Sequence, residues 1–273
     1  MTNKIRKILI GICSAVILVS LIILCKILIL DPMLADRTNK QAKDIYHSSE
    51  QETLAPEDKF KSLQELNSDI FGWIKINNTV IDYPVVWAQD GKAEFYLNHN
   101  YKKEKSKYGS IFMAPACDPT YIHRNTILYG HHMADGQMFA ELLKYSDLEF
   151  YKSHPVIKFD TILSENTWKI ISVFKTNTRE EHGEIFNYTV ADFDSTADFL
   201  EFVDEVKKRS LINIPVTVNE DDVLLTLSTC SYEYKDFRTV IVARKVRDQE
   251  DPEVETGEAT KASNPLMPAC YYR

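Results

Sequence analysis

An almost unbroken apolar run near the start of the chain limits what the rest of the protein can be. It covers residues 8–30, and the single charged residue within it is Lys26, near the far end. At about 1.5 Å per residue, a helix of this length crosses the roughly 30 Å hydrocarbon layer of a bilayer. A helix at the surface of a soluble domain needs a polar face, and this run has none. We therefore expect residues 8–30 to span a membrane.

The charges in front of this run indicate its orientation. Lys4, Arg6 and Lys7 precede it, and positive charges of this kind stay on the cytoplasmic side. A cleaved signal peptide is the alternative, but its apolar region is typically roughly 7 to 15 residues long and a small-x-small cleavage site follows it. We expect residues 1–30 to be a cytoplasmic N-terminus and transmembrane anchor, in a single-pass protein of the cell membrane whose main domain is extracellular.

The remainder of the chain is acidic. The sequence has 32 Lys+Arg and 40 Asp+Glu, which gives a formal net charge of −8, and the first thirty residues contain no acid. Binding to a nucleic acid backbone without sequence preference needs clustered Lys and Arg. Nucleic acid is therefore not an expected partner.

Five cysteines limit the chemistry that is open to the chain. Cys13 and Cys25 lie in the apolar run, whereas Cys117, Cys230 and Cys270 lie outside it. Their spacing has no Cys-x-x-Cys pair and no Cys/His cluster, so we expect no metal and no other cofactor. Three external cysteines leave at least one free thiol unless one pairs between chains, and a pairing of Cys117 with Cys270 stays open. A free thiol in an oxidising compartment is either buried and inert or kept for chemistry.

Three further segments are expected after the anchor. Residues 31–55 are polar without an apolar period, which predicts an extracellular stalk. Residues 56–247 form the main domain, which opens with a helix at 56–67. Residues 248–273 are acidic and then rich in proline, which predicts a disordered tail.

The main domain is expected to be mainly β. Eight short β-like runs, separated by polar or turn-forming stretches, predict one antiparallel barrel or sandwich. The runs are 71–76, 80–87, 110–113, 126–129, 156–162, 168–175, 223–229 and 239–246. A short helix is expected at 138–145 and a longer amphipathic helix at 192–210.

Three polar residues stand at the ends of these runs. Cys230 ends one run, His131 follows Gly130 at the end of another, and Arg238 opens the run after Cys230. A hairpin would bring Arg238 beside the thiol, and Gly130 would permit an abrupt change of backbone direction. A thiol, an imidazole and a guanidinium at one barrel rim can perform acyl transfer. His132, as the next residue on a strand, is expected to face away from His131 and to be dispensable.

Each of these residues also has a simpler explanation. A cysteine in a strand is often a small buried hydrophobic residue, and an arginine at the start of a strand is often a solvated surface charge. On the pattern alone, the three residues suggest a site without establishing one.

An ordered series of motifs within residues 57–247 makes the pattern more specific. Thr226-Leu227-Ser228-Thr229-Cys230 resembles the T-L-x-T-C signature of sortases, and Tyr129-Gly130-His131 resembles the segment that holds their catalytic histidine. The further similar segments are Gly72-Trp73-Ile74, Ile81-Asp82-Tyr83-Pro84-Val85-Val86, Gly109-Ser110-Ile111-Phe112-Met113 and residues 125–132. Together they resemble class B sortases, which are cysteine transpeptidases of Gram-positive bacteria.

The resemblance implies both a fold and a set of site residues. The implied fold is a closed, sortase-type, eight-stranded β-barrel with an N-terminal helix and a long helix between the sixth and seventh strands. The implied catalytic residues are Cys230 as nucleophile, His131 as acid and base, and Arg238 as ligand of the oxyanion or substrate carbonyl. The residues expected to bind substrate are Ser228, Thr229 and Leu97.

The resemblance also implies a reaction and its partners. Sortases cut a surface protein after the Thr of a C-terminal sorting motif, here expected to be of the x-Pro-x-Thr-x type. They hold the protein as a thioester and pass it to an amine of the peptidoglycan precursor. The partners expected are therefore surface proteins that carry a sorting signal, the precursor amine, and the membrane through residues 8–30.

The sequence also differs from the family at two places, and its tail beyond Val246 is longer than expected for the class. Ala114-Pro115-Ala116-Cys117 stands where class B members usually have an Asp, and Ala93 stands where some relatives have an Asn that contacts substrate. Asn264-Pro265-Leu266-Met267-Pro268 resembles a sorting signal without its Thr, and we interpret it as a coincidence.

Two other functions compete with this interpretation. A secreted cysteine peptidase or cell-wall amidase usually has its Cys before its His, whereas here His131 precedes Cys230 and an Arg follows. A membrane-tethered barrel that only binds would keep Cys230 buried and unreactive.

Overall fold

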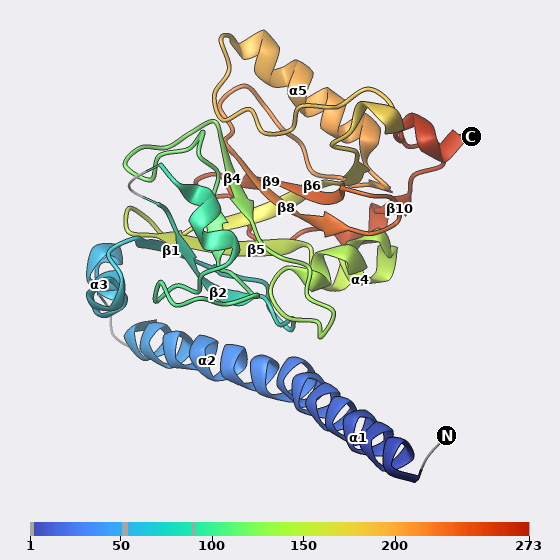
Figure 1. Ribbon diagram of the computed structural model, residues 1–273. Coiled ribbons are helices and arrows are strands. Elements are labelled where there is room, and N and C mark those ends of the chain that lie inside the picture. The colour runs from blue at the N-terminus through green and yellow to red at the C-terminus, as the bar shows by residue number, and fades with distance from the viewer. Residues whose placement is uncertain (1–2, 51–53, 89–90, 273) are drawn as a thin grey trace. The chain divides into compact units, whose positions relative to one another are not determined.

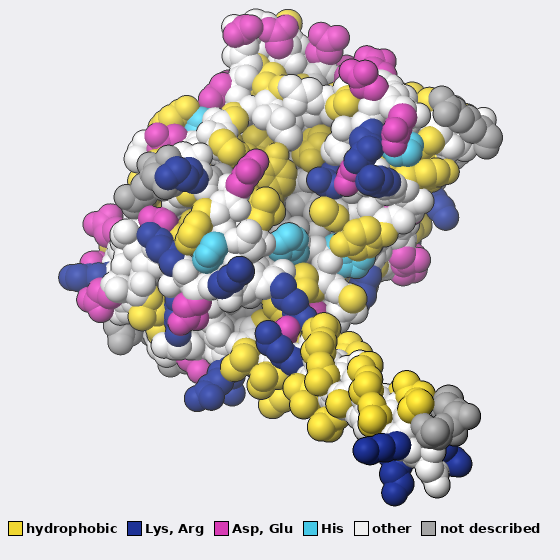
Figure 2. All heavy atoms as spheres, in the orientation of Figure 1, with side chains coloured by type: hydrophobic (Ala, Val, Ile, Leu, Met, Phe, Trp, Pro, Cys, Tyr) yellow, Lys and Arg dark blue, Asp and Glu magenta, His cyan; other side chains and the backbone are white. Residues whose placement is uncertain are grey.

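The computed structural model describes residues 3–50, 54–88 and 91–272 (Figure 1). The chain divides into two compact units, Met1–Ala42 and Lys43–Arg273. Helix α1 (Asn3–Cys25) continues through a π-helical turn (Lys26–Leu30) into helix α2 (Asp31–Glu50). No residue of α1 is buried, and Figure 2 shows hydrophobic side chains along it with Lys and Arg at its start. This N-terminal helix is long and apolar enough to cross a membrane.

The segment expected to be a stalk is largely helical, and its end belongs to the folded domain. Tyr46 of α2 is 1% exposed, and its ring stacks on Trp73 with centroids 4.4 Å apart. The Tyr46 hydroxyl donates a hydrogen bond of 2.6 Å to Asp160, and His47 donates one of 3.0 Å to Asp82. The domain therefore begins before residue 56, because α2 supplies side chains to its core. Residues 51–53 of the expected stalk lie outside the described part of the chain.

Eight strands close into a barrel, which confirms the predicted architecture. Their order around the barrel is β1-β2-β3-β4-β8-β9-β6-β5. The helix α3 (Pro56–Leu66) precedes them, and the strands are β1 (Ile70–Lys75), β2 (Asp82–Val86), β3 (Ile111–Met113), β4 (Asn125–Tyr129), β5 (Val156–Thr161), β6 (Thr167–Thr176), β8 (Leu224–Ser231) and β9 (Phe237–Lys245).

The barrel is mixed rather than antiparallel throughout. β2 pairs with β3, and β4 pairs with β8, in parallel. Two parallel neighbours need a long crossover connection. Short β-like runs in the sequence do not indicate such a crossover, so the parallel pairs were not predicted. The runs at 126–129 and 223–229 therefore lie side by side although they are far apart in the sequence.

The predicted long helix is present between the sixth and seventh strands of the barrel. It is α5 (Thr196–Arg209), and its first turn is capped by Ser195, whose Oγ accepts a hydrogen bond of 3.2 Å from the Asp198 N–H. Phe199, Phe202, Val203 and Val206 form its buried face. The expected helix at 138–145 is a 3₁₀ helix, η3 (Ala140–Ser146), and the other short helices are η2 (Ala93–Leu97), α4 (Leu148–Ser153), η4 (Glu180–His182), η5 (Thr256–Glu258) and η6 (Ala269–Tyr272).

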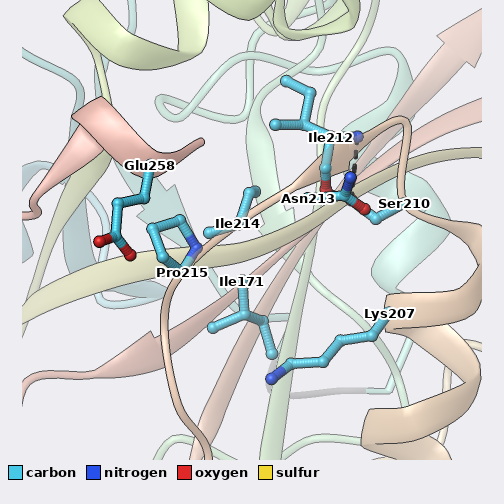
Figure 3. Close-up of a pocket in the computed structure, with 8 residues that line it drawn as sticks. All are labelled: Ile171, Lys207, Ser210, Ile212, Asn213, Ile214, Pro215 and Glu258. Carbon is cyan, nitrogen blue, oxygen red and sulfur yellow. Dashed lines mark hydrogen bonds between the residues drawn. The ribbon is translucent and has the colours of Figure 1, made fainter. Parts of the chain in front are cut away.

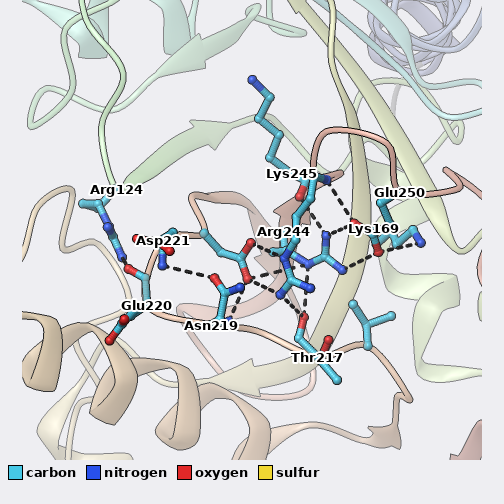
Figure 4. A network of polar contacts seen from close by, with 12 residues as sticks. Arg124, Lys169, Thr217, Asn219, Glu220, Asp221, Arg244, Lys245 and Glu250 are labelled. Atoms are coloured by element: carbon cyan, nitrogen blue, oxygen red, sulfur yellow. Dashed lines mark hydrogen bonds and ion pairs between the residues drawn. The ribbon is translucent and has the colours of Figure 1, made fainter.

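The C-terminal tail packs on the domain, so the prediction of disorder is wrong for residues 248–272. Strand β10 (Thr260–Lys261) pairs with β7 (Ile212–Asn213). Glu250 accepts hydrogen bonds from Arg244 (2.8 Å) and Lys169 (2.9 Å), as Figure 4 shows. Arg244 is 1% exposed, and a buried guanidinium needs a carboxylate partner. The composition of the tail predicted disorder because it does not show that Glu250 has partners on the barrel strands.

Candidate active site

The β8–β9 hairpin brings Cys230 and Arg238 together. The two residues are directly opposite each other in the strand register, and Thr176 of β6 faces Arg238 from the other side. The Arg238 Nη1 donates a hydrogen bond of 3.0 Å to the carbonyl oxygen of Phe237. Cys230 and Arg238 are both partly exposed, so a thiol and a guanidinium reach solvent side by side.

Strand β4 delivers His131 to the same edge of the barrel. β4 runs parallel to β8 with Tyr129 opposite Ser228, and the Gly130 N–H donates to the Ser228 carbonyl at 3.3 Å. Because parallel strands end at the same edge, His131 and Cys230 leave the sheet at one rim. The His131 Nε2 donates a hydrogen bond of 2.6 Å to the carbonyl oxygen of Leu97. This bond keeps the proton of the neutral ring on Nε2 and makes Nδ1 the acceptor.

Two glycines allow this close arrangement. A Cβ on Gly130 would lie 2.4 Å from Ile111 and 2.7 Å from the ring of Phe139. A Cβ on Gly109, which has a φ of +60°, would lie 2.6 Å from the Tyr96 carbonyl and 3.1 Å from the His131 ring. Gly130 was expected to permit a change of direction, but the structure shows that it permits close packing beneath the histidine.

Ser228 and Thr229 precede Cys230 on β8 and are both buried, with their side chains on opposite faces of the strand. Ser228 is 1% exposed, and its Oγ hydrogen-bonds to the Tyr188 hydroxyl at 2.9 Å. Thr229 is 2% exposed, and its Oγ1 donates to the Gly130 carbonyl at 2.8 Å. A substrate would reach either hydroxyl only by displacing these hydrogen bonds.

Sequence reasoning missed Tyr188 and the backbone of Leu97. Tyr188 lies in the connection from β6 to α5, and burial raises the pKa of its hydroxyl. Leu97 was expected to contribute its side chain, which is 41% exposed, whereas its carbonyl group orients His131. No sequence pattern marks either contact, because each depends on how a long connection packs against the barrel.

His132 lies closer to Cys230 than expected. Its ring stacks on Tyr232, which follows Cys230 in the chain, with centroids 5.1 Å apart. Burial lowers the pKa of His132. The two histidines contact different groups, but both follow the end of β4, so alternation along that strand does not place them.

The other two external cysteines are in different surroundings. Cys117 and Cys270 are buried free thiols, and burial raises the pKa of Cys117 to about 11. Cys230 is also a free thiol and is partly exposed. Of the three, Cys230 has the environment that a nucleophile requires.

A cavity of about 280 Å³ lies away from this rim, at the C-terminal end of α5 (Figure 3). It is lined by Ile171, Lys207, Ser210, Ile212, Asn213, Ile214, Pro215 and Glu258. The Lys207 Nζ donates a hydrogen bond of 3.1 Å to the Val216 carbonyl, so this ammonium group already has a partner within the protein. The cavity contains none of the residues that the motifs singled out and is not the candidate site.

Comparisons with known proteins agree on one family. Residues 74–246 match the Sortase domain. The chain is 39% identical over 191 residues to Sortase B of Listeria monocytogenes, covering 69% of this chain and 74% of that protein. It is 38% identical over 203 residues to Sortase B of Staphylococcus aureus, covering 73% and 79%. Among solved structures, a Staphylococcus aureus sortase B–substrate complex superposes with a TM-score of 0.72 at 34% identity, covering 80% of this chain and 99% of that chain.

Proposed function

Because the chain belongs to the class B sortases, a family of cysteine transpeptidases, we propose that it attaches surface proteins to the cell wall. It cleaves a C-terminal sorting motif of the x-Pro-x-Thr-x type and transfers the protein to an amine of the peptidoglycan precursor. The observation that carries this proposal is the register pair of Cys230 and Arg238 at the rim to which β4 brings His131. That a related Staphylococcus aureus structure is a substrate complex supports a substrate of the same kind here.

The first half of the reaction forms a thioester. The thiolate of Cys230 attacks the carbonyl carbon of the motif's Thr, and Arg238 donates hydrogen bonds to the resulting oxyanion. The C–N bond after Thr then breaks, and protonated His131 gives its proton to the departing amine. The bond from His131 Nε2 to the Leu97 carbonyl fixes the ring so that Nδ1 carries this proton.

The second half returns the enzyme to its starting state. The amine of the cell-wall precursor attacks the thioester carbonyl, and neutral His131 takes a proton from that amine. The C–S bond breaks, Cys230 leaves as thiolate, and a new amide bond joins the surface protein to the precursor. Among the site residues, Leu97 presents the exposed apolar side chain that a sorting peptide can contact.

The proposed location follows from the N-terminal helix. Residues 8–30 anchor the chain in the cell membrane, with the N-terminus in the cytoplasm and the catalytic domain outside. This places the thiol on the side of the membrane where a cell wall is assembled.

The test uses the full-length chain in detergent with peptides that contain x-Pro-x-Thr-x motifs. With hydroxylamine as the amine, the wild type should release a peptide hydroxamate, because the thioester is open to amine attack. Cys230→Ala should give neither cleavage nor hydroxamate, whereas Cys117→Ala, the matched control at a buried thiol, should retain activity. Cleavage by Cys230→Ala would overturn the proposal, and hydrolysis by the wild type without hydroxamate would favour a cysteine peptidase.

A further inference from the structure

The turn between β8 and β9 controls the geometry of the site. Residues 232–236 join the strand of Cys230 to the strand of Arg238, so a shift of this turn moves one side chain relative to the other. Two ion pairs hold the turn from the side of β6, Glu233 with Lys175 and Asp236 with Arg179. Both acidic partners are 31% or more exposed, and exposed pairs stabilise weakly, by roughly 0 to 1 kcal/mol. The Thr178 hydroxyl also donates a hydrogen bond of 2.7 Å to the Asp236 carbonyl, and the His182 ring packs on Tyr234 and Phe237.

The C-terminal helix η6 packs on the same turn. The ring of Tyr271 lies edge-on to Tyr234, with centroids 5.3 Å apart, and 5.8 Å from the ring of Phe237. The Tyr234 hydroxyl donates a hydrogen bond of 3.3 Å to the carbonyl of Cys270. Packed aromatic rings of this kind stabilise each other beyond the area that they bury.

The approach of η6 depends on Gly183. A Cβ on Gly183 would lie 2.9 Å from the backbone nitrogen of Ala269, and its φ of +121° is one that L side chains rarely adopt. Cys270 is 8% exposed, which shows that η6 is seated on the domain. The loop after η4 thus leaves room for the backbone of η6.

Phe237 connects η6 to the arginine. Its side chain is fully buried, and its carbonyl oxygen accepts the hydrogen bond from Arg238 Nη1. The position of the Phe237 backbone therefore sets the direction of the guanidinium, and the Tyr271 ring packs against the Phe237 ring.

We propose that η6 is a brace for the catalytic hairpin, and that Tyr271 is a positioning residue that acts through Phe237 on Arg238. The brace keeps the guanidinium aimed at the carbonyl oxygen while Cys230 attacks. Its effect on rate rests on the proposed function, whereas its effect on the turn does not.

The kinetic test compares two neighbouring tyrosines in the full-length chain. Tyr271→Ala should lower the rate of thioester formation about tenfold with little change in KM, since the lost contact orients a transition-state donor. Tyr271→Phe should restore the rate, because the Tyr271 hydroxyl has no hydrogen-bond partner among the described residues. Tyr272→Ala is the matched control: Tyr272 is 64% exposed, and its hydroxyl bonds to Met267 and Pro265 within the tail. Equal losses in Tyr271→Ala and Tyr272→Ala would overturn the proposal.

A double-mutant cycle tests the route through the arginine. If Tyr271 acts by orienting the guanidinium, Tyr271→Ala should have no further effect once Arg238→Lys has removed that guanidinium. Losses that multiply in the double variant would show that Tyr271 does not act on Arg238 and would overturn the proposal.

Hydrogen exchange tests the brace without any substrate. The amides of residues 231–237 should exchange several-fold faster in Tyr271→Ala than in the wild type, and at the wild-type rate in Tyr272→Ala. Unchanged exchange in Tyr271→Ala would overturn the brace. A wild type that processes no sorting peptide, with exchange as expected, would overturn the proposed function instead and leave the brace supported.

Discussion

Substitution of Arg238 is the most informative test at the scale of single residues, because its position next to Cys230 suggests a specific role for its guanidinium. It lies opposite Cys230 and Thr176, and lysine at this position would keep the charge but lose the planar fork. Loss of one oxyanion donor typically costs about a hundredfold in rate. We expect Arg238→Lys to lower the rate of thioester formation by about that factor with a nearly unchanged melting temperature, measured by single-turnover kinetics and thermal unfolding.

Arg179→Lys is the matched control for this experiment. Arg179 pairs with Asp236 at a side-chain exposure of 38%, where lysine can replace it. We expect near-normal kinetics. Should Arg238→Lys also retain normal turnover, the guanidinium is no oxyanion ligand and the catalytic set reduces to His131 and Cys230.

Thiol reactivity should distinguish the external cysteines. At pH 8, iodoacetamide should modify Cys230 far faster than Cys117, since Cys117 is 3% exposed and its pKa is raised to about 11 by burial. Few Cys117 side chains are thiolates at that pH, and the thiolate is the form that reacts. Peptide mass mapping over a time course gives both rates. Equal rates would mean that Cys230 is as protected as a structural cysteine, as a non-catalytic barrel requires.

At the scale of single residues, the sequence indicated which side chains come together, but it did not indicate the hydrogen bonds that orient them. Strand ends and motifs singled out His131, Cys230 and Arg238, and the strand register brings these three residues to one rim. The Leu97 carbonyl and the Tyr188 hydroxyl were not predicted, because both come from connections whose path depends on the folded barrel.

At the scale of elements, one carboxylate, that of Glu250, holds the start of the C-terminal tail on the barrel. Hydrogen bonds from Arg244, with Lys169 and the Arg247 N–H, hold the pKa of Glu250 well below its usual range. A lowered carboxylate pKa stabilises the fold above the unfolded-state pKa, near 4.5, and this stabilisation is lost as the pH falls below that value. We expect Glu250→Gln to lower the free energy of unfolding by about 2 kcal/mol at pH 7, with a difference that narrows in acid.

Denaturant titrations at pH 7 and pH 3 measure this difference. Glu253→Gln, at an exposed position of the same tail, is the control and should leave the free energy of unfolding unchanged at both values. A Glu250→Gln difference that is equal at pH 7 and pH 3 would mean that the Glu250 charge does not hold the tail.

Most elements were predictable, and the exceptions share a cause. All eight barrel strands and α5 lie close to their expected positions, because alternation and helical spacing are local properties. The parallel pairs and the packed tail were missed, because their partners lie far away in the sequence.

For the whole molecule, the N-terminal charges should determine topology. We expect the full-length chain to stay in the membrane fraction, with a reporter fused after Arg273 outside the cell, because positive charges such as Lys4, Arg6 and Lys7 favour the cytoplasmic side. Replacing all three by Glu should reduce the extracellular signal. A soluble form that begins near Asp31 would contradict the anchor.

The strand order also determines when the site can form during synthesis. Strands β1 to β6 can assemble into one open sheet, in the order β6-β5-β1-β2-β3-β4, as soon as they have been made. Its two edges, β6 and β4, stay unpaired until β8 and β9 insert between them, and such edges invite pairing with other chains. One of these last pairings, β4 with β8, joins the barrel strands that lie farthest apart in the sequence, which makes barrel closure slow. The hairpin that closes the barrel carries Cys230, so a nascent or truncated chain cannot bring Cys230, Arg238 and His131 to one rim.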